Sequence, residues 1–347
     1  MQFAIPYRPT WYLRNGLVQT LFTTYTYSQM WQRRRERSPW LQKLPLIPWQ
    51  EHCFAGFQDV PLWGLWSCPP HAVGTMILTY GITGDIETAW YARTLARKAY
   101  ARNWAVLVYD WRSHGKSAEL SPVPSSDGWC EGFDLVRLAE QLVKLGCPPR
   151  VALTGFSLGG QITLWGLKAA REEKSQYIRT AAVLSPNLES DRSLTRLLEY
   201  PIGRIIERVL AKELYRAAKL RGDRFPESVK RGAIERVDSI RAFDREMVID
   251  YYGFKTVKDY YKQTSGLYLL ERLELPHLLV YAADDPLFDA TLVPEIQRLA
   301  SQNPNTHLLL TPQGGHVSHI ASPTTREDEF WGLNRLLEFC EAILTDN

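Results

Sequence analysis

The stretch "VALTGFSLGGQ", residues 151–161, decides the fold, because an apolar run passes directly into a serine flanked by glycines. Residues 155–159 follow the pattern GxSxG, which forms a sharp turn with an exposed nucleophile when it ends a strand and opens a helix. The apolar segment that follows, "QITLWGLKAA", predicts that helix. A serine hydroxyl is inert without a base and an orienting acid. Ser157 is therefore either a nucleophile supported by other parts of the chain or one more small residue in a tight turn.

Six short apolar runs along the chain predict the strands of a sheet. They cover residues 74–80, 104–110, 150–156, 180–185, 276–282 and 306–312. Their composition is continuously apolar rather than alternating, which is typical of strands buried on both faces of a parallel sheet. Segments with helical periodicity, such as 87–100 and 132–146, lie between most of them. We therefore expect an α/β fold with a mostly parallel, doubly wound sheet.

Two regions interrupt this alternation and suggest a division of the chain. Residues 1–70 are rich in proline and tryptophan and end in a predicted antiparallel hairpin, so we expect an N-terminal extension packed on the core. Residues 71–186 and 266–347 would form the two parts of the core. Residues 187–265 lack strand patterns but contain an amphipathic stretch at 193–220, which predicts an inserted helical cap. We expect one apolar stripe of this cap to pack against the core and in part to line an acyl pocket; it comprises Leu197, Leu198, Ile202, Ile205, Ile206, Val209 and Leu210.

Composition and charge exclude several classes of protein. The 347 residues are 45% hydrophobic and 23% charged, which is typical of a globular domain, and a net charge of +3 is too small to indicate a nucleic-acid partner. The five cysteines form no CxxC pair, which argues against a disulfide framework or a zinc site and favours a reducing compartment. The pair His316 and His319 lacks the other residues that a metal site needs.

The N-terminus predicts neither a signal peptide nor a membrane span. Pro6 and Pro9 interrupt the first apolar residues, and no window holds the roughly 18 consecutive apolar residues of a transmembrane helix. We expect a cytoplasmic protein. The sequence "RRRER" at 33–37, flanked by Trp31 and Trp40, could still attract an anionic membrane surface, although a solvated charged face is the simpler interpretation.

An acid and a histidine follow Ser157 in the order that this type of turn requires. "LLVYAADDPLF", residues 278–288, places Asp284 and Asp285 at the end of one predicted strand. "LLLTPQGGHVSHI", residues 308–320, places His316 after the next. His316 would take the proton from Ser157, and the aspartate would orient the imidazole ring. We favour Asp285, which precedes a proline, and keep Asp284 as the alternative; His319 lies further from the glycine turn.

The same chemistry needs two backbone N–H groups that bind the developing oxyanion. One would come from Leu158, directly after the serine. The other would come from Ile82 in "LTYGITGD", residues 78–85, where Gly81 and Gly84 permit a close approach of the loop.

Motifs along nearly the whole chain resemble the α/β-hydrolase superfamily, and in particular its YheT-like and ABHD1/ABHD3-like branch. These motifs are "YRPTWYLRNGLVQTL" (7–21), "YGITGD" (80–85), "DWRSHGKS" (110–117), "GFSLGG" (155–160), "AADDPLF" (282–288) and "GGH" (314–316). The resemblance implies hydrolysis of carboxylic esters, often acylglycerols or phospholipids, without a metal or an organic cofactor. Its triad falls on Ser157, Asp285 and His316. The chain departs from the family at Tyr80, where histidine is usual, and at Ser113, where glycine is usual.

The residues and the resemblance together lead to one main hypothesis and two alternatives. The main hypothesis is a serine hydrolase that cleaves a small ester or a lipid through an acyl-enzyme. An acyltransferase or thioesterase would use the same triad, and a binding protein with a malformed oxyanion loop would use none of it. An epoxide hydrolase or dehalogenase is disfavoured, because those reactions need a carboxylate where Ser157 stands. We expect Asp110 and Arg112 to brace a loop through a structural ion pair.

Overall fold

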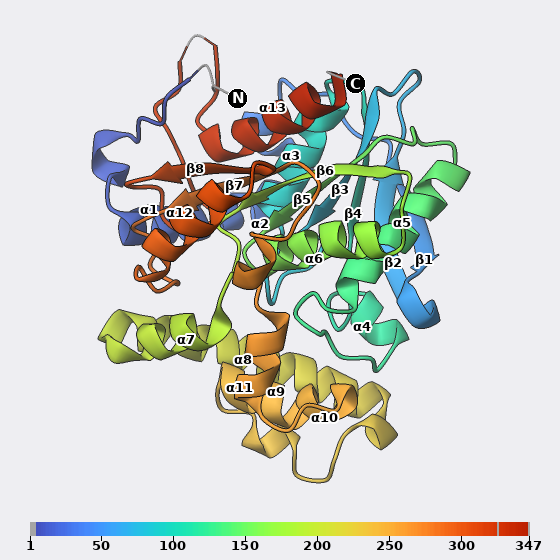
Figure 1. Ribbon diagram of the computed structural model, residues 1–347, viewed down its shortest axis with the longest axis vertical. Helices are drawn as coiled ribbons and strands as arrows, with labels where there is room; N and C mark the ends of the chain where they lie inside the picture. The colour runs from blue at the N-terminus through green and yellow to red at the C-terminus, as the bar shows by residue number, and fades with distance from the viewer. Residues whose placement is uncertain (1–4, 325, 346–347) are drawn as a thin grey trace.

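An eight-stranded sheet forms the centre of the computed structural model, which describes residues 5–324 and 326–345 (Figure 1). The strands are β1 Gln50–Ala55, β2 Pro61–Ser67, β3 Gly74–Thr79, β4 Trp104–Tyr109, β5 Val151–Phe156, β6 Ile178–Leu184, β7 His277–Ala282 and β8 Thr306–Thr311. Their order is β1-β2-β4-β3-β5-β6-β7-β8. β1 and β2 pair antiparallel, β2 pairs antiparallel with β4, and all other neighbours are parallel. The predicted fold, the six predicted strands and the hairpin are confirmed.

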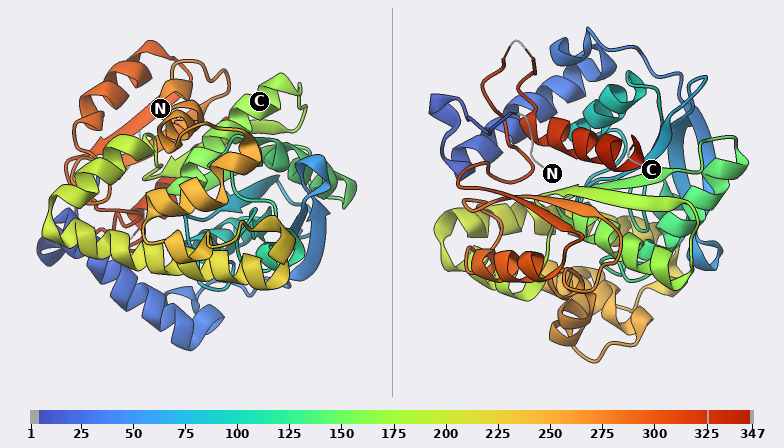
Figure 2. Two further views of the ribbon diagram at one scale, coloured as in Figure 1. Left: turned by 90° about the horizontal axis from the view of Figure 1, so that it is seen from below. Right: turned by 45° about the horizontal axis from the view of Figure 1, so that its top comes forward.

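Burial explains why these strands have continuous apolar sequences. Every residue of β3, β4, β5 and β7 is buried, since helices cover both faces of the sheet. Helices α3 Trp90–Tyr100 and α13 Trp331–Thr345 lie on one face, and α5 Glu131–Lys144, α6 Leu158–Glu172 and α12 Leu292–Gln302 on the other (Figures 1 and 2). β1 lies at one edge of the sheet, and of its six residues only Phe54 is buried.

The remaining short elements connect these layers. They are η1 Trp11–Leu13, η3 Arg35–Arg37, η4 Pro39–Leu41, η5 Phe57–Asp59, α4 Ser117–Leu120 and η8 Leu267–Leu269.

One N-terminal helical segment packs beside the sheet. It comprises α1 Gly16–Phe22, a π-helical segment η2 Thr23–Ser28 and α2 Gln29–Arg34, and we call it the N-terminal helix. Its inner side is unusually polar, because Gln19, Thr20 and Thr23 are buried there. Trp31 is also buried and donates a hydrogen bond to the Glu87 carbonyl (2.7 Å). Trp31 is therefore not available as an interfacial anchor for the alternative of membrane contact, and Trp40 is half-buried in an aromatic cluster.

The segment between β6 and β7 is helical, and we call its helices the cap. They are α7 Ser190–Glu199, α8 Pro201–Arg224, α9 Ile240–Met247, α10 Ile249–Tyr252 and α11 Val257–Thr264, with short turns η6 Pro226–Ser228 and η7 Ile234–Arg236. The cap lies together at one side of the molecule, beyond the carboxyl ends of the central strands (Figure 1). The amphipathic stretch at 193–220 is broken at Tyr200, because the proline that follows disfavours helical geometry in the residue before it.

The apolar stripe of the cap does not pack as expected. Leu197 is buried, but Leu198, Ile205 and Val209 are 37%, 53% and 58% exposed. On α8 a different side faces inward, and its buried residues are Gly203, Glu207, Ala211, Leu214 and Ala218. Leu198 lies on α7, next to the buried Leu197. Leu210 and Leu197 do line a cavity beside Ser157.

Candidate active site

Ser157 lies in a tight turn between β5 and α6, with φ 53° and ψ −124°. A residue other than glycine rarely adopts this region, and such strain is frequent where a side chain must be presented precisely. The flanking glycines are required by close backbone contacts. A Cβ atom at Gly155 would collide with the Gly159 carbonyl, and one at Gly159 would collide with the Tyr80 carbonyl.

The three predicted side chains meet in one hydrogen-bonded chain. His316 Nε2 lies 2.9 Å from Ser157 Oγ, and His316 Nδ1 lies 2.8 Å from Asp285 Oδ2. Asp285 is buried, and its other carboxylate oxygen accepts a hydrogen bond from the Leu287 N–H (2.9 Å). The three residues come from loops that follow β5, β7 and β8, so parallel strands bring them to the same edge of the sheet.

The two alternative residues occupy different environments. Asp284 forms no hydrogen bond with the imidazole of His316; its Oδ1 accepts a hydrogen bond from the Gly315 N–H (3.1 Å). His319 is fully buried, lies 3.0 Å from Thr311 Oγ1 through its Nε2, and stacks on Trp331. Burial lowers the pKa of His319 to about 3, so its ring is neutral at physiological pH. Within residues 5–324 and 326–345, no cluster of side chains has a composition suited to a metal ion.

The backbone around Ser157 offers two N–H groups. Leu158 is the first residue of α6, so its N–H has no acceptor within the helix. In the loop after β3, the N–H of Gly81 donates to Tyr91 (3.0 Å) and that of Thr83 to His114 Nε2 (3.3 Å). The N–H of Ile82 lies between them and has no acceptor among the described residues. Both Ile82 and Leu158 line the cavity that contains Ser157.

Tyr80 and Asp110 support the same loop. Tyr80 is fully buried and its hydroxyl donates to Asp110 Oδ1 (2.7 Å), while the Ile86 N–H donates to the same oxygen (2.9 Å). Burial raises the pKa of Asp110 to about 6. The expected ion pair of Arg112 exists, but its partner is Asp134, at 2.7 and 2.8 Å, and not Asp110. Tyr91 accepts the hydrogen bond of the Gly81 N–H. The sequence did not predict this role, because Tyr91 is one aromatic residue in an ordinary helical pattern.

Polar side chains of the N-terminal helix hold the loop that carries His316. Thr20 Oγ1 accepts a hydrogen bond from the His316 N–H (2.8 Å), and Gln19 Oε1 accepts one from the Ile320 N–H (2.6 Å). Thr23 and Ser318 share a hydrogen bond between their hydroxyls (2.9 Å). Gln19 and Thr20 belong to the motif "YRPTWYLRNGLVQTL", but sequence reasoning assigned them no role, because nothing in the chain indicates which loop they contact.

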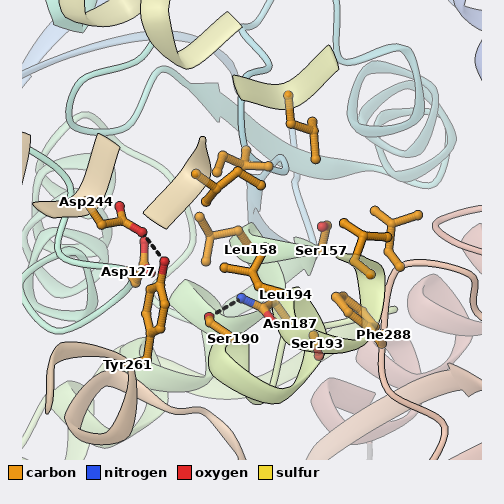
Figure 3. Close-up of a pocket in the computed structure, with 15 residues that line it drawn as sticks. Asp127, Ser157, Leu158, Asn187, Ser190, Ser193, Leu194, Asp244, Tyr261 and Phe288 are labelled. Atoms are coloured by element: carbon orange, nitrogen blue, oxygen red, sulfur yellow. Dashed lines mark hydrogen bonds between the residues drawn. The ribbon is translucent and has the colours of Figure 1, made fainter. Parts of the chain in front are cut away.

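Two adjoining cavities open beside Ser157. The one that contains Ser157 has a volume of 80 Å³ (Figure 3). Its apolar wall comprises Ile82, Leu158, Leu194, Leu197, Leu210, Ile240, Leu287 and Phe288, and its polar wall Asp127, Asn187, Ser190, Ser193, Asp244 and Tyr261. A larger cavity of 280 Å³ extends along α8. The two cavities share Ile82, Leu158 and the two carboxylates.

Comparison with known proteins identifies the family of the chain. Residues 71–328 match the model of the alpha/beta hydrolase family. The chain is 38% identical, over 96% of its length and 94% of the relative's, to "Putative esterase slr0264" of Synechocystis sp.. It is 25% identical to "Putative esterase YheT" of Escherichia coli, over 78% and 77% of the two chains. It is also 25% identical to the monoacylglycerol lipase of Saccharomyces cerevisiae, over 77% of this chain and 59% of that one.

Solved structures share the fold. The esterase of Pyrobaculum calidifontis superposes with a TM-score of 0.57, at 16% identity, over 94% of this chain and 92% of that chain. An esterase of Pyrococcus furiosus superposes with a TM-score of 0.55, at 18% identity, over 86% and 92%. Among the helices of the described residues, none combines the length and the apolar character needed to cross a bilayer.

Proposed function

The chain belongs to the α/β-hydrolase family, and we propose that it hydrolyses carboxylic esters with Ser157, His316 and Asp285 as its catalytic triad. The observation that carries this proposal is the continuous hydrogen-bond chain from Ser157 Oγ through both ring nitrogens of His316 to Asp285. This arrangement activates a hydroxyl that is otherwise a weak nucleophile.

The first half of the proposed reaction acylates the enzyme. His316 Nε2 takes the proton of Ser157 as Oγ attacks the ester carbonyl, and the N–H groups of Ile82 and Leu158 stabilise the resulting oxyanion. Asp285 holds the Nδ1–H and stabilises the imidazolium. His316 then gives the proton to the alkoxide as the carbon–oxygen bond of the ester breaks, which leaves an acyl group on Ser157.

The second half releases the acid. A water molecule gives a proton to His316 and attacks the acyl carbonyl, and the oxyanion forms again beside Ile82 and Leu158. The bond to Oγ breaks, and Ser157 recovers its proton from His316. These residues are sufficient for both steps, so the proposal includes no metal or cofactor.

The cavities and the relatives support an ester with an apolar part as substrate. Leucine, isoleucine and phenylalanine dominate the wall of the cavity at Ser157, which favours burial of a hydrocarbon group. Two of the curated relatives are a monoacylglycerol lipase and a phospholipase, ABHD3 of Mus musculus.

We further propose peripheral contact with lipid through the N-terminal residues. Trp11 and Tyr12, which precede the N-terminal helix, and Tyr25, which lies on it, are 77%, 51% and 62% exposed, and the exposed cations Arg33 and Arg34 lie in the last turn of the same helix. Amphipathic aromatic rings and cations favour an anionic lipid surface. We expect Trp11→Ser with Tyr12→Ser to reduce co-sedimentation with phosphatidylglycerol vesicles while leaving turnover of a soluble ester unchanged; equal sedimentation of variant and wild type would contradict this contact.

Substitution of the nucleophile tests the reaction. We expect Ser157→Ala to lower kcat for p-nitrophenyl esters by at least about 10,000-fold, and a fluorophosphonate probe to label the wild type but not the variant. Retained turnover in the purified variant would reject the triad, and an unlabelled wild type would favour a binding protein. Addition of an alcohol acceptor distinguishes hydrolysis from acyl transfer, because a transferase would form the new ester in preference to the free acid.

A further inference from the structure

The loop between β3 and α3, residues 81–86, is held in place through its backbone N–H groups. The acceptors are Tyr91 Oη for Gly81 (3.0 Å), His114 Nε2 for Thr83 (3.3 Å), the Gly81 carbonyl for Gly84 (3.3 Å), Thr88 Oγ1 for Asp85 (3.1 Å) and Asp110 Oδ1 for Ile86 (2.9 Å). The N–H of Ile82 has no acceptor among the described residues. Since backbone donors of folded proteins are nearly always paired, the loop is built so that the Ile82 N–H is left for a group that binds beside Ser157.

His114 is a buried histidine whose hydrogen bonds fix its tautomer. Its Nδ1 lies 2.9 Å from the Arg112 carbonyl oxygen, which can only accept, so Nδ1 carries the proton. The other nitrogen, Nε2, is then an acceptor and binds the Thr83 N–H. Burial lowers the pKa of His114 to about 4, so this neutral form is present at physiological pH. The ring also stacks on Trp111, with 3.4 Å between ring centres, which gives the acceptor a fixed position.

Thr83 needs such an anchor because its backbone is strained. It has φ 62°, in a region that β-branched residues rarely adopt. Thr83 directly follows Ile82, so the hydrogen bond to His114 fixes the peptide group that comes after Ile82. Without this bond, relaxation of Thr83 to an ordinary φ would rotate that peptide group and turn the N–H of Ile82 with it.

Tyr91 fixes the peptide group on the other side of Ile82. Its hydroxyl accepts the hydrogen bond of the Gly81 N–H, and its ring packs against Phe156 with 4.7 Å between ring centres. Phe156 is the last residue of β5 and directly precedes Ser157. A Cβ atom at Gly81 would lie only 3.0 Å from the Cβ of Ser157, so the loop and the serine turn are in close contact. Tyr91 therefore sets the position of the loop relative to the nucleophile.

Both departures from the family pattern lie in the same network. Tyr80 precedes the loop, and its hydroxyl donates to Asp110, a further anchor of the loop. Ser113 precedes His114, adopts φ 61° and donates its hydroxyl to the Val123 carbonyl (3.1 Å). The two unusual residues thus form hydrogen bonds that support the loop and its anchor.

We propose that His114 and Tyr91 are positioning residues that direct the N–H of Ile82 toward the oxyanion formed when Ser157 attacks an ester. Each accepts the N–H of one neighbouring peptide group, and both act through Ile82 rather than by touching the reacting atoms. The inference rests on the proposed ester hydrolysis. A preorganised donor stabilises the transition state more than the bound ester, so its displacement should lower kcat and leave KM nearly unchanged.

Two variants of nearly equal size separate the hydrogen bond of His114 from its packing. His114→Met removes the acceptor, whereas His114→Gln keeps one, because the Oε1 atom of glutamine can reach the position of Nε2. We expect His114→Met to lower kcat for p-nitrophenyl butyrate about 30-fold, and His114→Gln to keep at least about a third of the wild-type kcat, with KM within about threefold in both. Equal kcat values in the two variants would overturn the role of the hydrogen bond.

Inhibition by a trifluoromethyl ketone gives a readout that a purely structural role would not change. The adduct of the ketone with Ser157 carries an oxyanion where the transition state does, so the inhibition constant for His114→Met should rise by about the factor by which kcat falls. Tyr91→Phe removes only the acceptor of the Gly81 N–H and should show the same parallel change, of about tenfold. A loss of kcat without a loss of affinity for the ketone would overturn the proposal.

His277→Met is the matched control, because His277 is another buried histidine with the same pattern of hydrogen bonds. Its Nδ1 lies 2.9 Å from the Leu275 carbonyl oxygen and its Nε2 2.9 Å from Thr306 Oγ1, at the start of β7. This variant should lose stability but keep kcat and the inhibition constant. An equal loss of kcat in His277→Met would mean that the effect at His114 reflects general destabilisation. Failure of the ester hydrolysis proposal is distinguishable, since the wild type itself would then turn over no ester.

Discussion

The N-terminal helix and the cap both add helices to the same sheet, but they contact the site in different ways. The N-terminal helix contributes buried polar side chains, which hydrogen-bond the backbone of the loop that carries His316. The cap contributes apolar walls and one carboxyl group to the cavities beside Ser157. In the proposed reaction, the first region positions reacting groups, whereas the second shapes the space for the substrate. Damage to the first should lower kcat, and damage to the second should change selectivity.

The largest expected effect separates the two neighbouring aspartates. Asp285→Asn should lower kcat by about 10,000-fold, because the amide would stabilise the wrong imidazole tautomer of His316. Asp284→Asn should lower it by about tenfold, because Asp284 only connects the N-terminal helix and Gly315 through backbone N–H groups. Steady-state kinetics on a p-nitrophenyl ester compares the two variants, and the reverse order of effects would reassign the triad acid to Asp284.

Thr20 tests whether the N-terminal helix positions His316. Thr20→Val keeps the shape of the side chain but removes the acceptor for the His316 N–H, so we expect kcat to fall about 10- to 100-fold with little change in KM. Thr20→Ser restores the oxygen and should recover most of the activity. A loss of activity in the serine variant equal to that in the valine variant would show that packing, not the hydrogen bond, matters at this position.

Ala217 on α8 provides the corresponding test for the cap. It lines the larger cavity, so Ala217→Phe should shorten the space and lower kcat/KM for long-chain esters about tenfold relative to short-chain esters. Lys212→Ala, on the exposed side of the same helix, is the control and should leave the chain-length profile unchanged. Equal losses for long and short chains in Ala217→Phe would mean that the acyl chain does not occupy this cavity.

The central sheet could be predicted from the sequence because strands that are buried on both faces have continuously apolar sequences. The positions of Ser157, Asp285 and His316 could be predicted for a related reason: each follows a buried strand, and parallel strands end at a common edge. The structure brings the three side chains together, and their catalytic roles stay a proposal. Ser113, where the family usually has glycine, adopts φ 61°, so this departure keeps the glycine-like turn.

The remaining features depend on contacts that no local pattern encodes. Gln19 and Thr20 form hydrogen bonds with residues about 300 positions away, and nothing in their own segment indicates the partner. The stripe was predicted to pack against the core because it is apolar, but α8 turns a different side inward, which carries Gly203, Ala211 and Ala218 together with Glu207 and Leu214. Asp127 and Asp244 are distant in sequence and meet only because the cap folds over the core.

Asp127 of the core and Asp244 of the cap form a carboxyl pair in the walls of both cavities, which makes the contact between cap and core dependent on pH, and this is the smallest effect that we predict. Burial raises the pKa of Asp127 and Asp244 in the folded protein, so the folded state binds more protons than the unfolded state above the ordinary pKa of about 4. The free energy of unfolding should therefore fall as the pH rises from about 4 through the folded pKa values.

Asp244→Asn removes one of these groups. In urea titrations at pH 5 and pH 8, the variant should lose about 1 kcal/mol less of its free energy of unfolding between the two pH values than the wild type does. Glu246→Gln should leave this loss nearly unchanged, because ion pairing with Arg236 lowers the pKa of Glu246 and its contribution is lost only as the pH falls below the ordinary range of a glutamate. The same pH dependence in wild type and Asp244→Asn would show that the cap and the core are not coupled through this carboxyl pair.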